Sequence, residues 1–185
     1  MTDNSHRFAL IIGASKYKDP TLSQLKSPEA DVITLASVLS DPKLGNFQVS
    51  TAINQPINEL RRQIALFFRN KSKDDLLLLY FSGHGIRDDE GNLFLATSDT
   101  ERDFVDFTAI PAREITNLMD RGMSKRNVLM LDCCYSGAFA TGAKSALGSS
   151  IGTKNFFEGN GYGRIVLTAT DSLQYAWDGN SVLGE

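Results

Sequence analysis

The chain has 185 residues, of which 42% are hydrophobic and 22% are charged, and its formal net charge at pH 7 is −3. These values fit one soluble globular domain with a sizeable core and leave little room for a second domain. An acidic chain without a cluster of Lys or Arg is a poor candidate for binding nucleic acid or an anionic membrane.

The N-terminus and the cysteines predict the compartment. Residues 1–7 lack the apolar core of a signal peptide, and no apolar run approaches the roughly 18 residues that a membrane-spanning helix needs. The two cysteines, Cys133 and Cys134, are adjacent and cannot build a disulfide framework. We therefore expect a cytoplasmic protein.

Strands and helices are expected to alternate, which predicts a doubly wound α/β fold with a mostly parallel sheet. The first helix should bury one apolar face made of Val32, Leu35, Ala36, Val38 and Leu39. In chain order, we expect a strand over 8–13, a helix from Pro28 with Ser27 as its N-cap, a strand over 47–53, a helix from Pro56, a strand over 76–81, a hairpin turn over 87–92 leading into 93–95, a helix from Pro111, and strands over 128–131 and 164–169.

Two of these strands end in residues with reactive side chains. The strand over 76–81 is followed by Ser82-Gly83-His84-Gly85, and the strand over 128–131 is followed by Asp132-Cys133-Cys134. In parallel sheets, ligands and chemistry collect beyond the carboxyl ends of the strands. If the two strands are parallel neighbours, His84 and the cysteines arrive at the same edge of the sheet.

The alternation of side chains along a strand separates the two cysteines. Asp132 and Cys134 should share one side, as Ser82 and His84 do, while Cys133 points to the other side and into the core. A thiol attacks as thiolate, and a neighbouring imidazole lowers its pKa or takes its proton. This assigns Cys134 as nucleophile and His84 as base, since the other histidine lies in a terminal tail that is expected to be frayed.

Other uses of these residues are less consistent with the sequence. A single buried Cys or a single His at a strand end is more often structural, but their joint placement favours a Cys–His enzyme. A zinc site is disfavoured because adjacent cysteines lie too close together and no fourth ligand is present. A vicinal disulfide switch is equally disfavoured, and Gly13 belongs to no phosphate-binding loop.

The stretches Tyr80-Phe81-Ser82-Gly83-His84-Gly85 and Asp132-Cys133-Cys134-Tyr135-Ser136-Gly137 resemble the motifs of caspases, metacaspases and bacterial caspase-like proteases (orthocaspases, peptidase family C14). Cys134 follows His84 by 50 residues, close to the spacing of roughly 50 in caspases. The resemblance extends to the strand over 10–13 and to residues 165–170. It implies a three-layer α/β/α fold and a cysteine endopeptidase, with Cys134 as nucleophile, His84 as proton-transfer partner, and an oxyanion hole made by the N–H groups of Gly85 and Cys134.

The resemblance also implies a division of the chain. Residues 1–140 correspond to the large subunit, residues 141–163 to a flexible intersubunit loop, and residues 164–185 to the start of an apparently truncated small subunit. Lys144, Lys154 and Arg164 are candidate processing sites in or beside that loop. The expected partners are protein substrates, the chain's own small-subunit segment as a separate chain, or an upstream activating protease.

Departures from the caspase pattern indicate cleavage after Arg or Lys. Caspases that cut after Asp carry a Gln two residues before the nucleophile, where this chain has Asp132, and pocket arginines where it has Leu25 and Asp178. Asp31 resembles a second pocket acid of metacaspases, with Ser82 beside it. The alternative for Asp31 is an ordinary solvated charge on a helix.

The calcium set of some metacaspases is incomplete in this chain. Asp99 lies near the matching region, but Thr100 and Thr141 stand where further acids would be needed. Residues 88–90 are more simply an acidic solvated turn. No metal or other cofactor is therefore expected, with calcium dependence left open.

The resemblance implies a role in bacterial stress response, programmed cell death or antiviral defence, with activation of a zymogen by proteolysis or by a regulatory partner. One alternative is a catalytically silent caspase-like scaffold, which is disfavoured because both His84 and Cys134 are present. The other is a flavodoxin-like ligand-binding domain, which is disfavoured because the chain lacks a phosphate loop.

Overall fold

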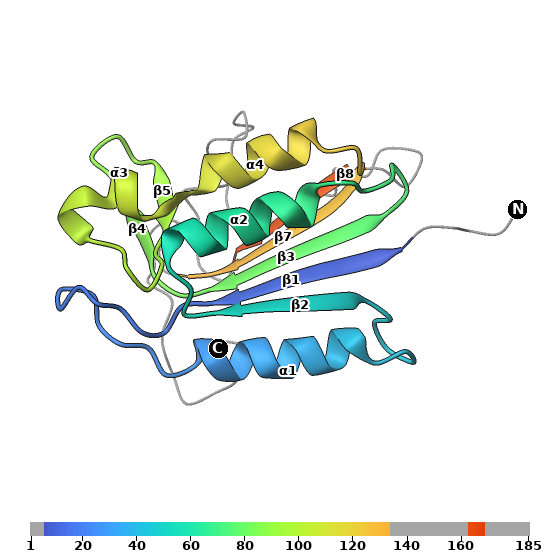
Figure 1. The fold of residues 1–185 in the computed structure, drawn as a ribbon, viewed down its shortest axis with the longest axis horizontal. Helices are drawn as coiled ribbons and strands as arrows, with labels where there is room; N and C mark the ends of the chain where they lie inside the picture. The colour runs from blue at the N-terminus through green and yellow to red at the C-terminus, as the bar shows by residue number, and fades with distance from the viewer. Residues whose placement is uncertain (1–5, 134–162, 169–185) are drawn as a thin grey trace, which may run out of the picture.

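The computed structural model describes residues 6–133 and 163–168. Its centre is a sheet in the order β2-β1-β3-β7-β8, and every neighbouring pair is parallel (Figure 1). This confirms the predicted α/β fold. The strands are β1 (Arg7–Gly13), β2 (Gln48–Ile53), β3 (Leu76–Ser82), β7 (Arg126–Asp132) and β8 (Gly163–Thr168).

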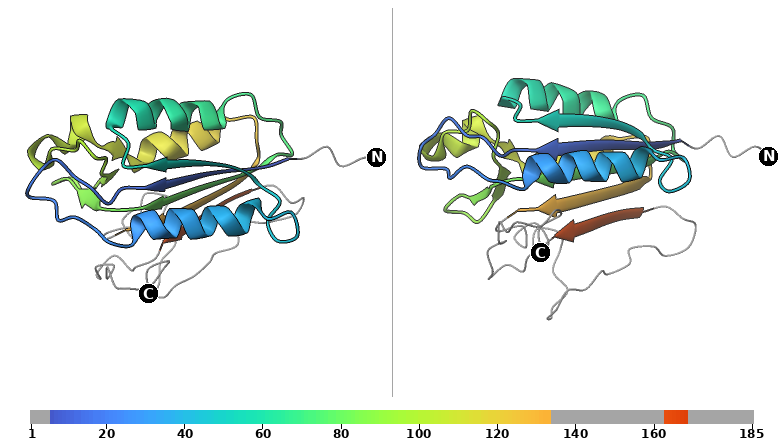
Figure 2. Two further views of the ribbon diagram at one scale, coloured as in Figure 1. Left: turned by 60° about the horizontal axis from the view of Figure 1, so that its bottom comes forward. Right: turned by 90° about the horizontal axis from the view of Figure 1, so that it is seen from below.

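Helices cover both faces of this sheet, which gives the three layers. The helix α1 (Pro28–Ser40) lies on one face, whereas α2 (Ile57–Phe68) and α4 (Ala112–Arg121) lie on the other (Figures 1 and 2). Strands enclosed in this way must be apolar on both sides, which explains the uninterrupted apolar runs of β1 and β3.

The start of α1 agrees with the prediction, but part of its buried face does not. Pro28 occupies the first turn and Ser27 the N-cap position, although the Ser27 side chain makes no capping hydrogen bond. Val38 is 45% exposed, so its assignment to the buried face is wrong. Val32, Leu35 and Leu39 follow the spacing of one helix face, whereas a residue six positions after Val32 is turned well away from it.

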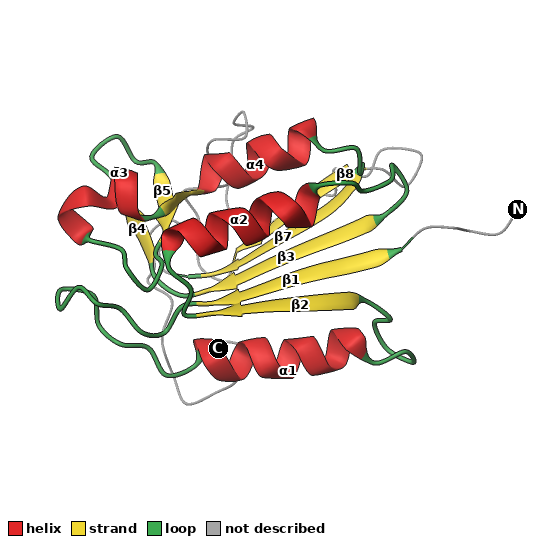
Figure 3. Ribbon diagram, in the orientation of Figure 1, coloured by secondary structure: helices red, strands yellow, loops and turns green. Residues whose placement is uncertain are grey.

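A second, smaller sheet follows β3. Its antiparallel strands are β4 (Gly85–Arg87), β5 (Leu93–Leu95) and β6 (Ile110–Pro111), and the predicted hairpin turn lies between the first two. A short 3₁₀ helix η1 (Arg102–Phe104) and the helix α3 (Val105–Thr108) precede β6. Figure 3 shows these elements beyond the arrowheads of the central strands.

The strand register brings the carboxyl ends of the central strands together. Ser82 pairs with Gly13 of β1 on one side and with Asp132 of β7 on the other. Gly13 also lets α1 approach this edge, because a Cβ atom there would lie 2.7 Å from a methyl group of Val32 and 2.8 Å from the carbonyl oxygen of Pro28. The edge of the sheet and the first turn of α1 therefore form one site.

The predicted division of the chain falls largely on residues 134–162 and 169–185, which lie outside the described part. The strand predicted over 164–169 is confirmed as β8, which pairs with β7. Within the described ranges, no helix is long and apolar enough to cross a membrane.

Candidate active site

His84 lies where the chain leaves the central sheet for the small one. It follows β3 by two residues, immediately precedes β4, and is half-buried. Its Nε2 atom lies 2.9 Å from the carbonyl oxygen of Ser23 and 3.3 Å from the Ser23 hydroxyl oxygen. A carbonyl oxygen can only accept, so Nε2 carries a proton whenever this bond forms, and the neutral ring keeps its lone pair on Nδ1.

The loop that supplies Ser23 is tied to its surroundings. The Asn54 side-chain oxygen accepts hydrogen bonds from the backbone N–H groups of Ser15 (2.8 Å) and Lys16 (3.0 Å). The Ser15 hydroxyl donates to Glu29 at 2.9 Å, and this bond, followed by one from Lys16, holds the pKa of Glu29 below its usual range. The loop after β1 is therefore a fixed support for His84.

The second histidine lies at the other end of the sheet. His6 immediately precedes β1, its backbone N–H donates to Asp75 at 3.0 Å, and its Nδ1 atom lies 3.5 Å from the same carboxylate. It is anchored there, so the expectation of a frayed residue is wrong. Its position excludes it from any site that contains His84.

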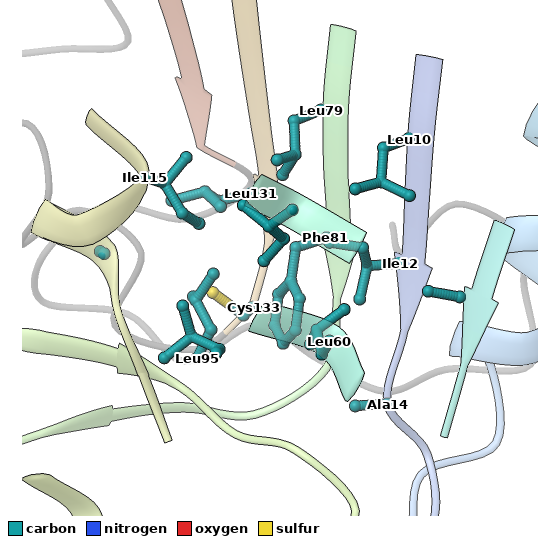
Figure 4. Packing of buried hydrophobic residues seen from close by; sticks show 14 of the residues in the cluster. Leu10, Ile12, Ala14, Leu60, Leu79, Phe81, Leu95, Ile115, Leu131 and Cys133 are labelled. Atoms are coloured by element: carbon teal, nitrogen blue, oxygen red, sulfur yellow. The ribbon is translucent and has the colours of Figure 1, made fainter. Parts of the chain in front are cut away.

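Cys133, the first of the two adjacent cysteines, belongs to the core. Cys133 is 2% exposed and packs among the core residues, including Phe81 and Leu131, which confirms its prediction as a core residue (Figure 4). Cys134 lies outside the described residues. It follows Asp132 by two positions as His84 follows Ser82, and the ladder continues past that pair, because the Gly83 N–H donates to the Asp132 carbonyl at 3.2 Å.

Acidic side chains meet on the α1 side of the same edge. Asp31 is completely buried and accepts a hydrogen bond from the Ser82 hydroxyl at 3.2 Å. The alternative of a solvated helix charge is therefore wrong. Tyr80 donates to Asp132 at 3.2 Å, and burial, followed by the charges of Asp132 and Asp31, raises the pKa of Tyr80. The phenol therefore stays neutral and donates to Asp132 without adding a charge beside the two acids.

The other predicted site residues that the structure describes lie in β4, against the core and in β8. Gly85 is buried as the first residue of β4, and Leu25 packs against the core. Arg164 is the second residue of β8 and pairs with Asn127, near the amino end of that strand. Asp178, Lys144 and Lys154 lie outside the described residues.

Asp99 and Thr100 have local structural roles. Asp99 accepts from the Ile57 N–H at 2.8 Å, at the start of α2, and from the Thr97 hydroxyl at 2.9 Å. Thr100 is fully buried and donates to the Thr108 carbonyl at 2.7 Å. Among residues 6–133 and 163–168, no group of three or more His, Cys, Asp or Glu side chains could hold a metal ion.

Sequence reasoning missed the contributions of Tyr17, Ser23 and Tyr80. Ser23 lies 61 residues from His84 and contributes its backbone carbonyl, which leaves no pattern in a sequence. Tyr80 belongs to the strand expected over 76–81, and strand alternation places its side chain on the side of Ser82.

Comparisons with known proteins agree with this fold. The chain is similar over 97% of its length to 64% of caspase-1 from Spodoptera frugiperda, with a TM-score of 0.65 and 15% identity. It is also similar over 73% of its length to 53% of a crystallised protein of Geobacter sulfurreducens, with a TM-score of 0.57 and 20% identity. The chain thus spans between about half and two thirds of these two proteins. A search of curated proteins found no match. The family model of the caspase domain (peptidase C14) matches residues 6–184, and the chain therefore belongs to the caspase-domain family.

Proposed function

We propose that this protein is a cysteine endopeptidase that cleaves protein substrates after Arg or Lys, with Cys134 as nucleophile and His84 as proton-transfer partner. The observation that carries the proposal is the placement of His84. Its Nε2 atom faces the Ser23 carbonyl, and its strand lies in parallel register beside the strand that leads to Cys134. Membership of the caspase-domain family supports the proposal.

The geometry supports a definite sequence of proton movements. The lone pair on Nδ1 of His84 takes the Cys134 proton, and the thiolate attacks the carbonyl carbon of the scissile bond. The N–H groups of Gly85 and Cys134 are proposed to stabilise the resulting oxyanion. The imidazolium then protonates the leaving amine, and water hydrolyses the thioester while His84 takes and returns a proton. The Ser23 carbonyl accepts from Nε2–H throughout and stabilises the imidazolium.

Preference for a basic residue rests on the two acids of the α1 side. Asp31 is removed from water and Asp132 is half-buried, while their neighbours Ser82 and Tyr80 are neutral donors. Two acids that lie together at one edge of the sheet favour a guanidinium or an ammonium group and disfavour a substrate carboxylate. Asp178 is proposed as a third acid of this pocket.

The biological setting follows from family resemblance. We propose activation by proteolytic processing or by a regulatory partner, in a cytoplasmic pathway of bacterial stress, cell death or antiviral signalling. Cleavage at Lys144, Lys154 or Arg164 would separate the large and small parts of the chain.

The proposal is tested with fluorogenic peptides ending in Arg, Lys or Asp, with and without calcium. We expect hydrolysis after Arg or Lys by the wild type, loss of hydrolysis in Cys134→Ala and in His84→Gln, and retention in the matched control Cys133→Ala. Hydrolysis only after Asp would overturn the pocket assignment. No hydrolysis of any peptide or protein substrate by the wild type would favour the silent scaffold.

A further inference from the structure

The hydroxyl group of Tyr17 stands in a gap of the ladder between β1 and β3. In a parallel pair, a residue of one strand donates its N–H to one residue of its partner and accepts from the residue two positions further on. Ala14 donates to the Ser82 carbonyl at 2.9 Å, so the next bond should run from the His84 N–H to the Ala14 carbonyl. Instead, the His84 N–H donates to the Tyr17 hydroxyl at 3.0 Å, and that hydroxyl donates to the Ala14 carbonyl.

This insertion decides where the backbone of His84 lies. The hydroxyl takes the place of one direct hydrogen bond and holds the two chains one oxygen atom further apart. Gly83, directly before His84, keeps the chains close on the other side of the gap, since a Cβ atom there would lie 3.0 Å from the Ala14 carbonyl oxygen. The chain therefore diverges from β1 within one residue, at His84.

The ring of Tyr17 acts on the imidazole itself. The two rings are in contact in a tilted arrangement, with centroids 4.9 Å apart and an angle of 37° between their planes. Tyr17 is only 6% exposed, and its backbone N–H and carbonyl are both bound by the side-chain amide of Gln24, at 3.0 and 2.9 Å. The same amide closes the loop that carries Ser23. Tyr17 and the Ser23 carbonyl are thus parts of one rigid loop on two sides of His84.

We infer that Tyr17 is a positioning residue for His84. Its hydroxyl fixes the backbone of the histidine, and its ring fixes the plane of the imidazole so that Nε2–H points to Ser23 and Nδ1 keeps its lone pair. The inference rests on the proposed function for its catalytic meaning, but the state of the imidazole is measurable without any activity. A purely structural Tyr17 would support the core and leave the tautomer of His84 unchanged.

The test measures the imidazole nitrogens of the full chain by NMR after labelling histidine with ¹⁵N. His6→Gln removes the only other histidine of the sequence and serves as the parent. The variants are Tyr17→Phe, which keeps the ring, and Tyr17→Leu, which removes it. Phe68→Leu is the matched control, because Phe68 is a buried aromatic residue at the end of α2, away from His84.

In the parent and in Phe68→Leu, we expect the Nε2–H tautomer alone at a pH at which the ring is neutral. In Tyr17→Phe, we expect both tautomers, and kcat for the Arg peptide should fall roughly 10- to 100-fold with KM little changed, because a misplaced base lowers the rate of the chemical step. Tyr17→Leu should show a larger effect on both readouts.

A folded Tyr17→Phe with the Nε2–H tautomer and kcat of the parent would overturn the inference. If Tyr17→Leu fails to fold, Tyr17→Phe still decides, because it removes one oxygen atom and keeps the packed ring. If the parent hydrolyses no peptide but Tyr17→Phe shows the expected change of tautomer, the result would contradict the proposed function and support the positioning role.

Discussion

The carboxylate of Asp31 and the hydroxyl group of Ser82 lie 3.2 Å apart, although 51 residues separate them in the chain. The contact joins the first turn of α1 to the last residue of β3 and takes Asp31 completely out of water. A buried carboxylate at the edge of a parallel sheet has a large effect on which charge can bind beside it.

Asp31→Asn is expected to lower kcat/KM for Arg and Lys peptides about 100-fold, equivalent to about 3 kcal/mol, because the amide keeps the shape and removes the charge that a cation would meet. Steady-state kinetics with both charged and uncharged peptides shows how much of the loss in kcat/KM is specific to a basic residue at the cleaved position. Asp106→Asn, on the exposed α3, is the matched control and should retain wild-type kinetics. An equal loss for charged and uncharged peptides would contradict a role in the pocket.

The adjacent cysteines should give opposite results when each is replaced. Cys133→Ala removes a sulfur atom from the core, so we expect a loss of about 1 kcal/mol in the free energy of unfolding and continued hydrolysis. Cys134→Ala should abolish hydrolysis at an unfolding free energy within about 0.5 kcal/mol of the wild type, the range typical of substitutions outside the core. Urea denaturation and peptide hydrolysis of both variants check this, and the reverse pattern would exchange the assignments.

Acid should weaken the amino end of the sheet through Asp75. Burial alone would raise the pKa of Asp75, but hydrogen bonds from the backbone N–H groups of Ser72 (2.8 Å) and His6 (3.0 Å) outweigh it, and the pKa is lowered. A carboxyl whose folded pKa lies below its unfolded value of about 3.9 stabilises the fold above that value and loses this contribution as the pH falls through the folded pKa.

We therefore expect Asp75→Asn to lower the free energy of unfolding at pH 6 and to reduce its decline between about pH 4 and pH 2. Urea denaturation across this range is the measurement, with Asp106→Asn as the control. A decline as steep in Asp75→Asn as in the wild type would show that other groups carry the acid sensitivity.

Self-processing should depend on the nucleophile. On incubation, intact-protein mass spectrometry is expected to detect fragments that end at Lys144, Lys154 or Arg164 in the wild type and none in Cys134→Ala. Replacing the residue at the cut by Gln should abolish that fragment alone. Identical masses for wild type and Cys134→Ala would show that the chain does not process itself and would leave activation to another protease.

The sequence by itself determined the local features of this protein. The apolar runs of β1, β3 and β7 specify buried strands, Pro28 marks the start of α1, and strand alternation assigns Cys133 to the core. These features follow from the period of side chains and from the restricted backbone of proline, which operate within a few residues. The same signals predicted the parallel sheet.

Only the tertiary structure decided what surrounds His84 and Asp31. These surroundings depend on how the loop after β1 and the helix α1 pack against the ends of β1 and β3. This packing brings the Ser23 carbonyl and the Tyr17 hydroxyl into contact with His84 and buries Asp31. A contact made by a backbone group cannot be predicted from residue types, because every residue carries the same backbone groups. A contact between residues far apart in the sequence is set by strand register and by the close approach that Gly13 allows. Packing at long sequence separation thus made a site from residues that the sequence could name only in part.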